Sequence, residues 1–288
     1  MTIAIGLFGF GYTAQAFATR LVNHHIQVYA TSRCQDTREQ FSQSDIKVLD
    51  FNRQNAQLIF ATCDAILITI PPNDEAGDPV LSHFQDELLA NRKHINWLGY
   101  LSSTGVYGDH QGAWVTETSP PINPGPTARR RITAESTWLT LYQQYGLPVH
   151  VFRLAGIYGP GRSSINKIQS GIDRTIYNPE QVFSRIHVDD IAEALSLSLT
   201  TPTPGEIFNL CDDLPASTCD VDAYAAALLN CLKPQPIHFE QANLSPKALE
   251  FFQGNKRVCN KKIKHQLRLK LQYPSYKEGL RRIVANTR

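Results

Sequence analysis

Two glycines and an alanine with the spacing Gly-x-Gly-x-x-Ala follow the first apolar stretch, at Gly9, Gly11 and Ala14. The glycines permit a tight turn out of a strand and a close approach of the backbone to a ligand, and the alanine lets the next helix pack closely. Because free N–H groups at a helix N-terminus favour an anion, the pattern predicts a dinucleotide diphosphate here. An unrelated glycine-rich turn is the alternative. The expected contacts are Gly6, Gly9, Phe10, Gly11, Tyr12, Thr13 and Ala14.

The second apolar stretch ends in Ser32 and Arg33, where an NAD-binding protein carries an acidic residue for the ribose hydroxyls. A guanidinium suits a 2′-phosphate, and Ser32 adds a hydroxyl, so NADP is the first expectation and NAD the second. Arg33 in a solvent-facing loop is the alternative. Asp50, which ends the third stretch, is expected near the adenine amino group. Thr69 and Ile70, which end the fourth, are further expected cofactor contacts.

Apolar runs that alternate with helical patterns predict the elements that position these residues. A run such as 65–70, which is apolar throughout and ended by two prolines, is typical of a strand buried on both faces. The alternation predicts a doubly wound, parallel α/β sheet of the Rossmann type. Expected strands are 3–8, 27–32, 47–50, 65–70, 97–102, 149–154 and 206–210, and expected helices are 14–23, 80–93, 126–145 and 188–199.

The pattern changes after the Tyr158-Gly159-Pro160-Gly161 turn, where a loop is expected to run to about Gly171. We therefore predict a dinucleotide-binding domain over residues 1–160, completed by 186–212. A smaller α+β lobe for the substrate, formed by 161–185 and 213–288, is expected at the carboxyl edge of the sheet, where open α/β folds place ligands.

Composition excludes several classes of protein. The 288 residues are 42% hydrophobic and 19% charged, as in globular enzymes, and a net charge of +2 offers no reason to expect a nucleic-acid partner. No apolar run reaches the roughly 18–20 residues of a membrane helix, and the N-terminus lacks the features of a signal peptide, so a cytoplasmic protein is expected. The six cysteines have no metal-binding spacing, which favours reduced thiols and no metal site.

Four further stretches carry a resemblance to a known family. They are Ser102-Ser103-Thr104-Gly105-Val106-Tyr107-Gly108, Glu117 with its following prolines, Arg153 to Gly161, and His187-Val188-Asp189-Asp190. In this order, and after the glycine motif, they resemble the extended short-chain dehydrogenase/reductases, the family of nucleotide-sugar epimerases and dehydratases. The resemblance covers nearly the whole chain and implies a nicotinamide cofactor, a small-molecule substrate and possible pairing into a homodimer.

The family's catalytic pair is Tyr-x-x-x-Lys, followed four residues later by a glutamate. Aligned on Glu135, the lysine position holds Arg131 and the tyrosine position holds Thr127, and the spacing of four places all three on one helical face. A threonine hydroxyl is far less acidic than a phenol, and an arginine does not exchange its proton near neutrality. The Tyr273–Lys277 pair has the family spacing but stands near the C-terminus, and we regard it as coincidence. The chain thus resembles atypical members of the family.

The resemblance implies that Ser103 hydrogen-bonds the reacting oxygen, although a strand-end capping role is the alternative. We expect the catalytic set to be Ser103, Thr127, Arg131 and Tyr107, with Arg131 also holding the nicotinamide ribose. Tyr107 is a candidate surrogate acid, and a structural role is its alternative. Further candidates for proton transfer, each with the same structural alternative, are Glu117, Tyr158 and His187. The expected substrate contacts are Ser103, Thr104, Tyr158 and Arg162, and Arg153 with Asp189 is expected to form a polar anchor.

Two functions of different classes follow. The first is an NAD(P)-dependent oxidoreductase, or an epimerase/dehydratase-like enzyme, that acts on a carbinol or carbonyl carbon of a substrate such as a nucleotide sugar. The second is a dinucleotide-binding sensor or scaffold that has lost hydride chemistry, which the joint loss of the tyrosine and the lysine favours. The retained Ser103 favours the enzyme.

Overall fold

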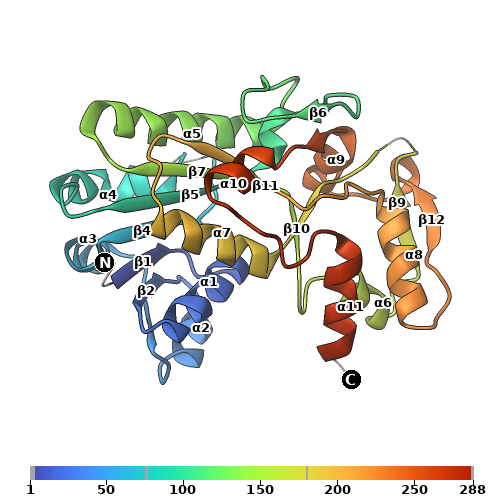
Figure 1. Ribbon diagram of the computed structural model, residues 1–288, viewed down its shortest axis with the longest axis horizontal. Coiled ribbons are helices and arrows are strands. Elements are labelled where there is room, and N and C mark those ends of the chain that lie inside the picture. Colours follow the sequence, from blue (N-terminus) through green and yellow to red (C-terminus); the bar gives the residue numbers. More distant parts are fainter. Residues whose placement is uncertain (1–3, 75–76, 180, 287–288) are drawn as a thin grey trace. The chain divides into compact units, whose positions relative to one another are not determined.

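Seven strands form one sheet in the order β11-β7-β5-β4-β1-β2-β3 (Figure 1). The computed structural model describes residues 4–74, 77–179 and 181–286. The strands are β1 (Ala4–Phe8), β2 (Gln27–Thr31), β3 (Ile46–Leu49), β4 (Ala65–Ile68), β5 (Trp97–Ser103), β7 (Val149–Leu154) and β11 (Ile207–Leu210). The parallel, doubly wound α/β sheet expected from the sequence is confirmed. The predicted first residue of β1, Ile3, lies outside the described residues.

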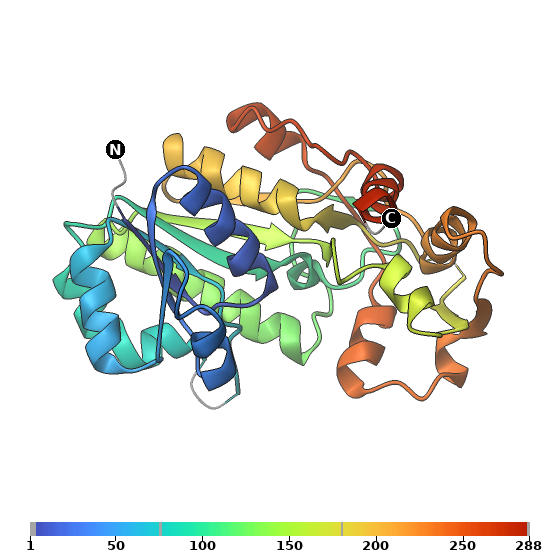
Figure 2. The ribbon, with the colours of Figure 1, turned by 90° about the horizontal axis from the view of Figure 1, so that it is seen from below.

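Helices cover both faces of this sheet. Figure 2 shows α1 and α7 on one face and α3, α4 and α5 on the other. The helices are α1 (Tyr12–Asn23), α2 (Gln35–Gln40), α3 (Arg53–Thr62), α4 (Pro79–Ala90), α5 (Pro126–Tyr145) and α7 (Val188–Thr200). α4 begins where the Asp78 carboxylate accepts hydrogen bonds from the N–H groups of Val80 and Leu81, with Pro79 as the first helical residue.

The chain divides into two compact units. The first comprises Met1–Ser102, Arg130–Arg153 and Ile191–Phe208, and the second Ser103–Arg129, Leu154–Asp190 and Asn209–Arg288. The division into domains expected from the sequence stays a prediction. The core of the first unit packs apolar side chains of the buried strands against Trp138 of α5 and Phe84 of α4.

The second unit combines short parallel strand pairs with helices. The strands are β6 (Trp114–Val115), β8 (Gly156–Tyr158), β9 (Arg174–Tyr177), β10 (Arg185–His187), β12 (Gln235–His238) and β13 (Arg257–Val258), paired β10 with β8, β12 with β9 and β13 with β6. The helices are α6 (Ser164–Gln169), α8 (Thr218–Leu228), α9 (Pro246–Gln253), α10 (Lys261–Gln266) and α11 (Tyr276–Asn286), with 3-10 turns η1 (Thr104–Tyr107) and η2 (Phe239–Gln241). A separate core joins α6, α8 and α11.

Two expectations about local structure were wrong. The segment expected to be a loop up to Gly171 contains α6, which begins where Ser163 Oγ accepts a hydrogen bond from the N–H of Asn166. The strand expected over 65–70 ends at Ile68, and the N–H of Thr69 just beyond it makes the last hydrogen bond to β1, to Phe8 O at 2.9 Å. No helix among the described residues is long and apolar enough to cross a membrane.

Candidate functional site

The turn from β1 to α1 is held from both neighbouring strands. The N–H of Gly9 donates to Thr31 Oγ1 at 3.1 Å, from β2, and Thr69 Oγ1, just beyond β4, donates to Phe8 O at 3.1 Å. In a sheet of this order β1 and β4 flank the point where strand order reverses, and ligands of open α/β folds bind beyond the carboxyl ends of strands there. Thr69 was expected at this turn, whereas Thr31 was not.

The N-terminus of α1 presents backbone N–H groups without a side-chain cap. Gly11 is its N-cap residue, and a glycine has no side chain that could cap the helix. A Cβ atom built on Gly11 meets nothing within 4 Å, so the backbone borders open space on that side. Uncapped N–H groups beside open space are the features that a diphosphate requires. The residues present therefore fit the dinucleotide expected from the glycine motif.

The other residues of the motif pack inward. A Cβ atom on Gly6 would lie 2.3 Å from a methyl carbon of Ile59, so this glycine permits close packing of α3. Phe10 is buried edge-on against Phe41, and Thr13 and Ala14 are buried in α1. These residues support the turn through packing, and their roles as cofactor contacts stay predictions.

The carboxyl end of β2 carries two guanidinium groups. Arg33 is exposed, as expected. Arg38, which the sequence did not single out, donates through NH1 to Ser32 O at 2.7 Å and lies 3.2 Å from Asp50 Oδ1. Ser32 Oγ accepts from the N–H of Cys34 at 3.2 Å. Asp50, expected to meet adenine, is thus an ion-pair partner of Arg38.

Helix α5 is hydrogen-bonded to the carboxyl end of β5. Arg131 NH1 donates to Leu101 O at 2.7 Å and to the Tyr100 hydroxyl at 3.1 Å. Burial raises the pKa of Tyr100 above its ordinary value, against the opposing effect of the nearby Arg131 charge, so this phenol is a poor proton donor. Arg131 thereby fixes the strand immediately before Ser102 and Ser103.

One turn along α5, Glu135 forms a buried ion pair with Arg153 of β7. Arg153 donates to both carboxylate oxygens, with an NH2–Oε2 distance of 2.8 Å, and Ser102 Oγ donates to Oε1. Glu135 is 4% exposed, so its charge depends on these donors. The sequence placed Arg153 in a polar anchor with Asp189 but did not anticipate this partner. Asp189 Oδ2 lies 3.5 Å from His187 Nδ1.

Ser103 stands at the junction of β5 and η1. Its Oγ accepts a hydrogen bond from the N–H of Gly105 at 3.0 Å and so caps the 3-10 turn. An accepting hydroxyl keeps its own proton to donate, and within the described part of the chain this proton has no acceptor. The capping alternative and a role toward a substrate oxygen are therefore compatible. Thr104, beside it, is buried.

Tyr107 and Glu117 converge on Asn209, a residue that sequence reasoning missed. The Tyr107 hydroxyl donates to Asn209 Oδ1 at 2.6 Å, and Glu117 Oε1 accepts from the N–H of Asn209 at 2.9 Å. Tyr107 is 1% exposed. Its proton is committed inside the second unit, which leaves it poorly placed to act as a surrogate acid.

Tyr158 and His187 also face the interior of the second unit. The Tyr158 hydroxyl donates to Ser275 O at 3.2 Å, and burial, reinforced by nearby carboxylates, raises its pKa. The His187 ring lies 3.9 Å from the ring of Tyr273, centroid to centroid, and burial lowers its pKa, so the imidazole is neutral near pH 7. Neither side chain offers a proton at a surface of this unit.

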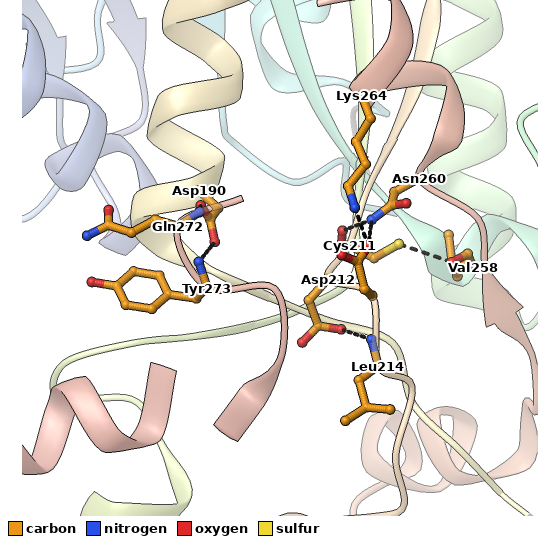
Figure 3. Close-up of polar contacts among 10 residues, drawn as sticks. Asp190, Cys211, Asp212, Leu214, Val258, Asn260, Lys264, Gln272 and Tyr273 are labelled. Atoms are coloured by element: carbon orange, nitrogen blue, oxygen red, sulfur yellow. Dashed lines mark hydrogen bonds and ion pairs between the residues drawn. The ribbon is translucent and has the colours of Figure 1, made fainter. Parts of the chain in front are cut away.

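Two buried carboxylates of the second unit were also missed (Figure 3). Asp190 accepts from the N–H groups of Gln272 and Tyr273 at 2.7 and 3.1 Å and so fastens the chain before α11. Asp212 accepts from the N–H of Leu214 at 3.2 Å, while its Oδ2 is buried and has no hydrogen-bond partner among the residues that the structure describes. Burial raises the pKa of Asp212 to about 8, which favours the protonated carboxyl over the carboxylate.

The two remaining site residues expected from the sequence are Thr127, in the first turn of α5, and Arg162, in the turn after β8. Thr127 is half-buried in the first turn of α5, and the continuity of this helix confirms the four-residue spacing to Arg131. Arg162 is exposed, and its backbone pairs with Gly159. Among the residues described, no group of three or more His, Cys, Asp or Glu side chains could hold a metal ion.

Comparisons with known proteins agree with this geometry. The profile of the NAD dependent epimerase/dehydratase family matches residues 84–211, and that of the coenzyme F420-dependent NADP oxidoreductases matches residues 4–91. Protein YeeZ of Escherichia coli (strain K12) is 29% identical, over 94% of this chain and 96% of its own. The structure of dTDP-glucose 4,6-dehydratase from Bacillus anthracis, in complex with NAD, has a TM-score of 0.80 at 18% identity, covering 98% of this chain and 96% of that one.

A functionally unknown conserved protein from Silicibacter pomeroyi DSS is more similar still. Its structure has a TM-score of 0.88, with 40% identity over 99% of both chains. Its similarity thus extends over both units, and the epimerase/dehydratase profile covers the segment that holds β5, the two serines and α5. Over residues 84–211 the chain is therefore similar to the NAD dependent epimerase/dehydratase family, and its fold is that of the dTDP-glucose 4,6-dehydratase structure.

Proposed function

We propose that this protein is an NADP(H)-dependent oxidoreductase of the atypical short-chain type, which acts on a carbinol or carbonyl carbon. The observation that carries the proposal is the β1–α1 turn. It combines an uncapped helix N-terminus, a glycine that borders open space and a backbone held by Thr31 and Thr69. Such a combination suits the binding of an anionic diphosphate.

Residues of the first unit would hold the coenzyme. The N–H groups at the start of α1 would bind the diphosphate, Arg33 the 2′-phosphate, and Arg131 the nicotinamide ribose. The nicotinamide, when bound, supplies or accepts a hydride. NADP is the first choice because the carboxyl end of β2 carries guanidinium groups where NAD-binding proteins carry an acid. NAD is the second choice.

Residues of the second unit would handle the substrate. The Ser103 hydroxyl has a proton to donate to a substrate oxygen, Thr127 would share that oxygen, and Arg162 would attract an anionic group. Neither Tyr107 nor Tyr158 is placed to exchange a proton, since both hydroxyls are committed within the unit. A nucleotide sugar is the first substrate class to test, because a dTDP-glucose dehydratase shares this fold.

Titration of the purified protein with NADPH and NADH tests the coenzyme assignment. We expect NADPH to bind with a change in its fluorescence. Arg33→Asp should raise the Kd of NADPH by about 10-fold or more and that of NADH by less than about 2-fold, because only NADPH carries the 2′-phosphate. Arg174→Asp, which makes the same charge change at an exposed guanidinium of the second unit, is the control. Binding of neither nucleotide would end the proposal.

The second candidate is a sensor or scaffold that binds the dinucleotide without turnover. The positions of the family's catalytic tyrosine and lysine hold Thr127 and Arg131, and the Arg131 guanidinium is tied to β5. Turnover with a panel of nucleotide sugars and small carbonyl compounds decides between the two. Oxidation of NADPH with any of them supports the enzyme, and tight binding without oxidation supports the sensor.

A further inference from the structure

Two carboxyl groups buried in the second unit have unused hydrogen-bonding capacity. Asp222 of α8 accepts through Oδ2 from Lys167 Nζ at 2.6 Å and from Thr175 Oγ1 at 2.5 Å. Its Oδ1 is buried and, like Asp212 Oδ2, has no hydrogen-bond partner among the described residues. Both aspartates are 1% exposed. Buried polar atoms without a partner are rare in folded proteins, so each of these oxygens calls for a further partner.

The Arg185 guanidinium of β10 lies close to both carboxyl groups. The backbone N–H of Asp212 donates to Arg185 O at 2.6 Å, which places the two residues next to each other. Burial lowers the pKa of Arg185, and the nearby charges of Asp212 and Asp222 oppose this effect. Its NH1 donates to Phe183 O and Ala216 O, whereas Nε and NH2 make no hydrogen bond to the described residues and are not fully buried. These two nitrogens keep their hydrogens for a further acceptor.

The hydroxyl of Tyr276, in α11, lies near the same guanidinium. The side chain is 5% exposed and packs in the apolar core of the second unit. Burial raises the pKa of this phenol, and the nearby Arg185 charge opposes the rise. Within the described part of the chain the hydroxyl makes no hydrogen bond, so it can both donate and accept. We call Arg185, Asp212, Asp222 and Tyr276 the Arg185 cluster; its members come from β10, α8, α11 and the segment after β11 (Figure 1).

The Arg185 cluster presents donors and acceptors together, which restricts the ligand that it fits. An anion accepts from Arg185 but has no hydrogen for Asp222 Oδ1. An ammonium group donates to Asp222 but is repelled by the charges of Arg185 and Lys167. A hydroxyl group accepts from a guanidinium and donates to a carboxylate with the same oxygen. The cluster also has more open positions than one water, which makes about three hydrogen bonds, so several hydroxyl groups on one molecule match it better.

We propose that the Arg185 cluster is a binding site for a neutral, hydroxyl-rich small molecule, a sugar or cyclic polyol. None of its members is among the residues proposed to hold the coenzyme or to contact the reacting oxygen. The inference therefore goes beyond the proposed function and does not rest on it.

Isothermal titration calorimetry of the purified protein tests the proposal. The neutral probes are D-glucose, D-galactose, D-mannose and myo-inositol, and the charged probes are inorganic phosphate and methylammonium. At least one neutral probe should give saturable binding, and neither charged probe should. Calorimetry is preferred to thermal melts because sugars excluded from protein surfaces stabilise folded proteins in general.

Two variants connect binding to the Arg185 cluster. Tyr276→Phe removes a hydroxyl that has no partner in the described structure, so it should leave Tm near that of wild type and raise the Kd of the bound probe by about 5-fold. Asp222→Asn turns Oδ1 into an N–H donor and should raise this Kd by about 10-fold or more. The matched controls Tyr145→Phe and Asp173→Asn, at exposed side chains, should keep the wild-type Kd.

The outcomes separate this inference from the proposed function. Lack of binding by every neutral probe, stronger binding of phosphate, or a Tyr276→Phe protein with wild-type affinity overturns the inference. Ordered water then satisfies the cluster. Tyr276→Phe decides the matter even if Asp222→Asn folds poorly, and its NADPH titration should match that of wild type. A protein that binds a neutral probe but neither nucleotide keeps this inference and loses the proposed function.

Discussion

Gly9 and Gly11 stand two residues apart, yet a side chain at each would meet different surroundings. Gly9 has a φ of +97°, and a Cβ there would lie 2.4 Å from Thr69 Oγ1 and 2.9 Å from a side-chain carbon of Ile70. Gly11 has an extended backbone that any residue adopts, and its Cβ would meet nothing within 4 Å. The fold therefore requires Gly9, whereas the packing of the described residues does not require a glycine at Gly11.

Substitution at these two glycines separates folding from binding. Gly11→Val should leave Tm nearly unchanged and raise the Kd of NADPH by about 10-fold or more, because the new methyl groups fill space that the diphosphate needs. Gly9→Ala should lower the free energy of unfolding by on the order of 1–3 kcal/mol, from left-handed backbone strain and the clash with Thr69. Thermal melts and nucleotide titrations measure the two effects. A Gly11→Val protein with unchanged affinity would place the dinucleotide elsewhere.

At the scale of elements, α5 fastens the end of β5 at two successive turns. Arg131 holds Leu101, and Glu135 holds Ser102 while it pairs with Arg153 of β7. These contacts fix the strand end that leads directly into Ser103. The helix therefore has a positioning role at this end of β5.

The buried ion pair should show strong coupling in unfolding experiments. Glu135→Ala leaves the Arg153 charge uncompensated, so it should cost about 3–5 kcal/mol of unfolding free energy. Arg153→Ala should cost a similar amount, and the double variant clearly less than the sum. Glu193→Ala, which breaks the exposed pair with Arg20, is the control and should cost no more than about 1 kcal/mol. Additive costs in urea titrations would contradict this account.

At the scale of the whole molecule, each of the two units has its own apolar core, and the second unit also buries charged groups. Asp212 is 1% exposed and lies near the Arg185 charge and the like charges of Asp213 and Asp190. Arg185 donates to Phe183 O and Ala216 O and does not hydrogen-bond this carboxyl in the described structure. Burial therefore dominates and holds the pKa at about 8.

Stability should consequently depend on pH through Asp212. Its ordinary pKa is about 3.9, so between roughly pH 4 and pH 8 the folded state binds more protons than the unfolded state. The free energy of unfolding falls as pH rises through this window. Asp212→Asn removes this dependence and keeps an acceptor for the N–H of Leu214. The Tm of the variant minus the Tm of wild type should therefore be larger at pH 8.5 than at pH 5.

The variant Asp173→Asn makes the same substitution at an exposed side chain and serves as the reference for this pH series. It should follow wild type at both pH values. A parallel course for Asp212→Asn and wild type from pH 5 to pH 8.5 would show that Asp212 does not bind its proton more tightly in the folded state.

Much of the architecture was predictable because its signals are local. Continuous apolar runs identify buried strands, and the glycine spacing identifies the turn of β1 into α1, since both depend on neighbouring residues. α6 escaped prediction because six residues are too short to show a helical period. The residues around the site were harder, since Thr31 and Glu135 act through partners 22 and 33 positions away.

The sequence by itself therefore determined the parallel sheet, the glycine-rich turn from β1 to α1 and the four-residue spacing of Thr127, Arg131 and Glu135, because period and spacing in one segment encode them. Only the tertiary structure decided that Arg38 forms an ion pair with Asp50, that Glu135 bonds both Ser102 and Arg153, and that the Tyr107 hydroxyl donates to Asn209. Strand order and helix packing bring these partners together, and no local sequence pattern specifies which distant side chain each of them will contact.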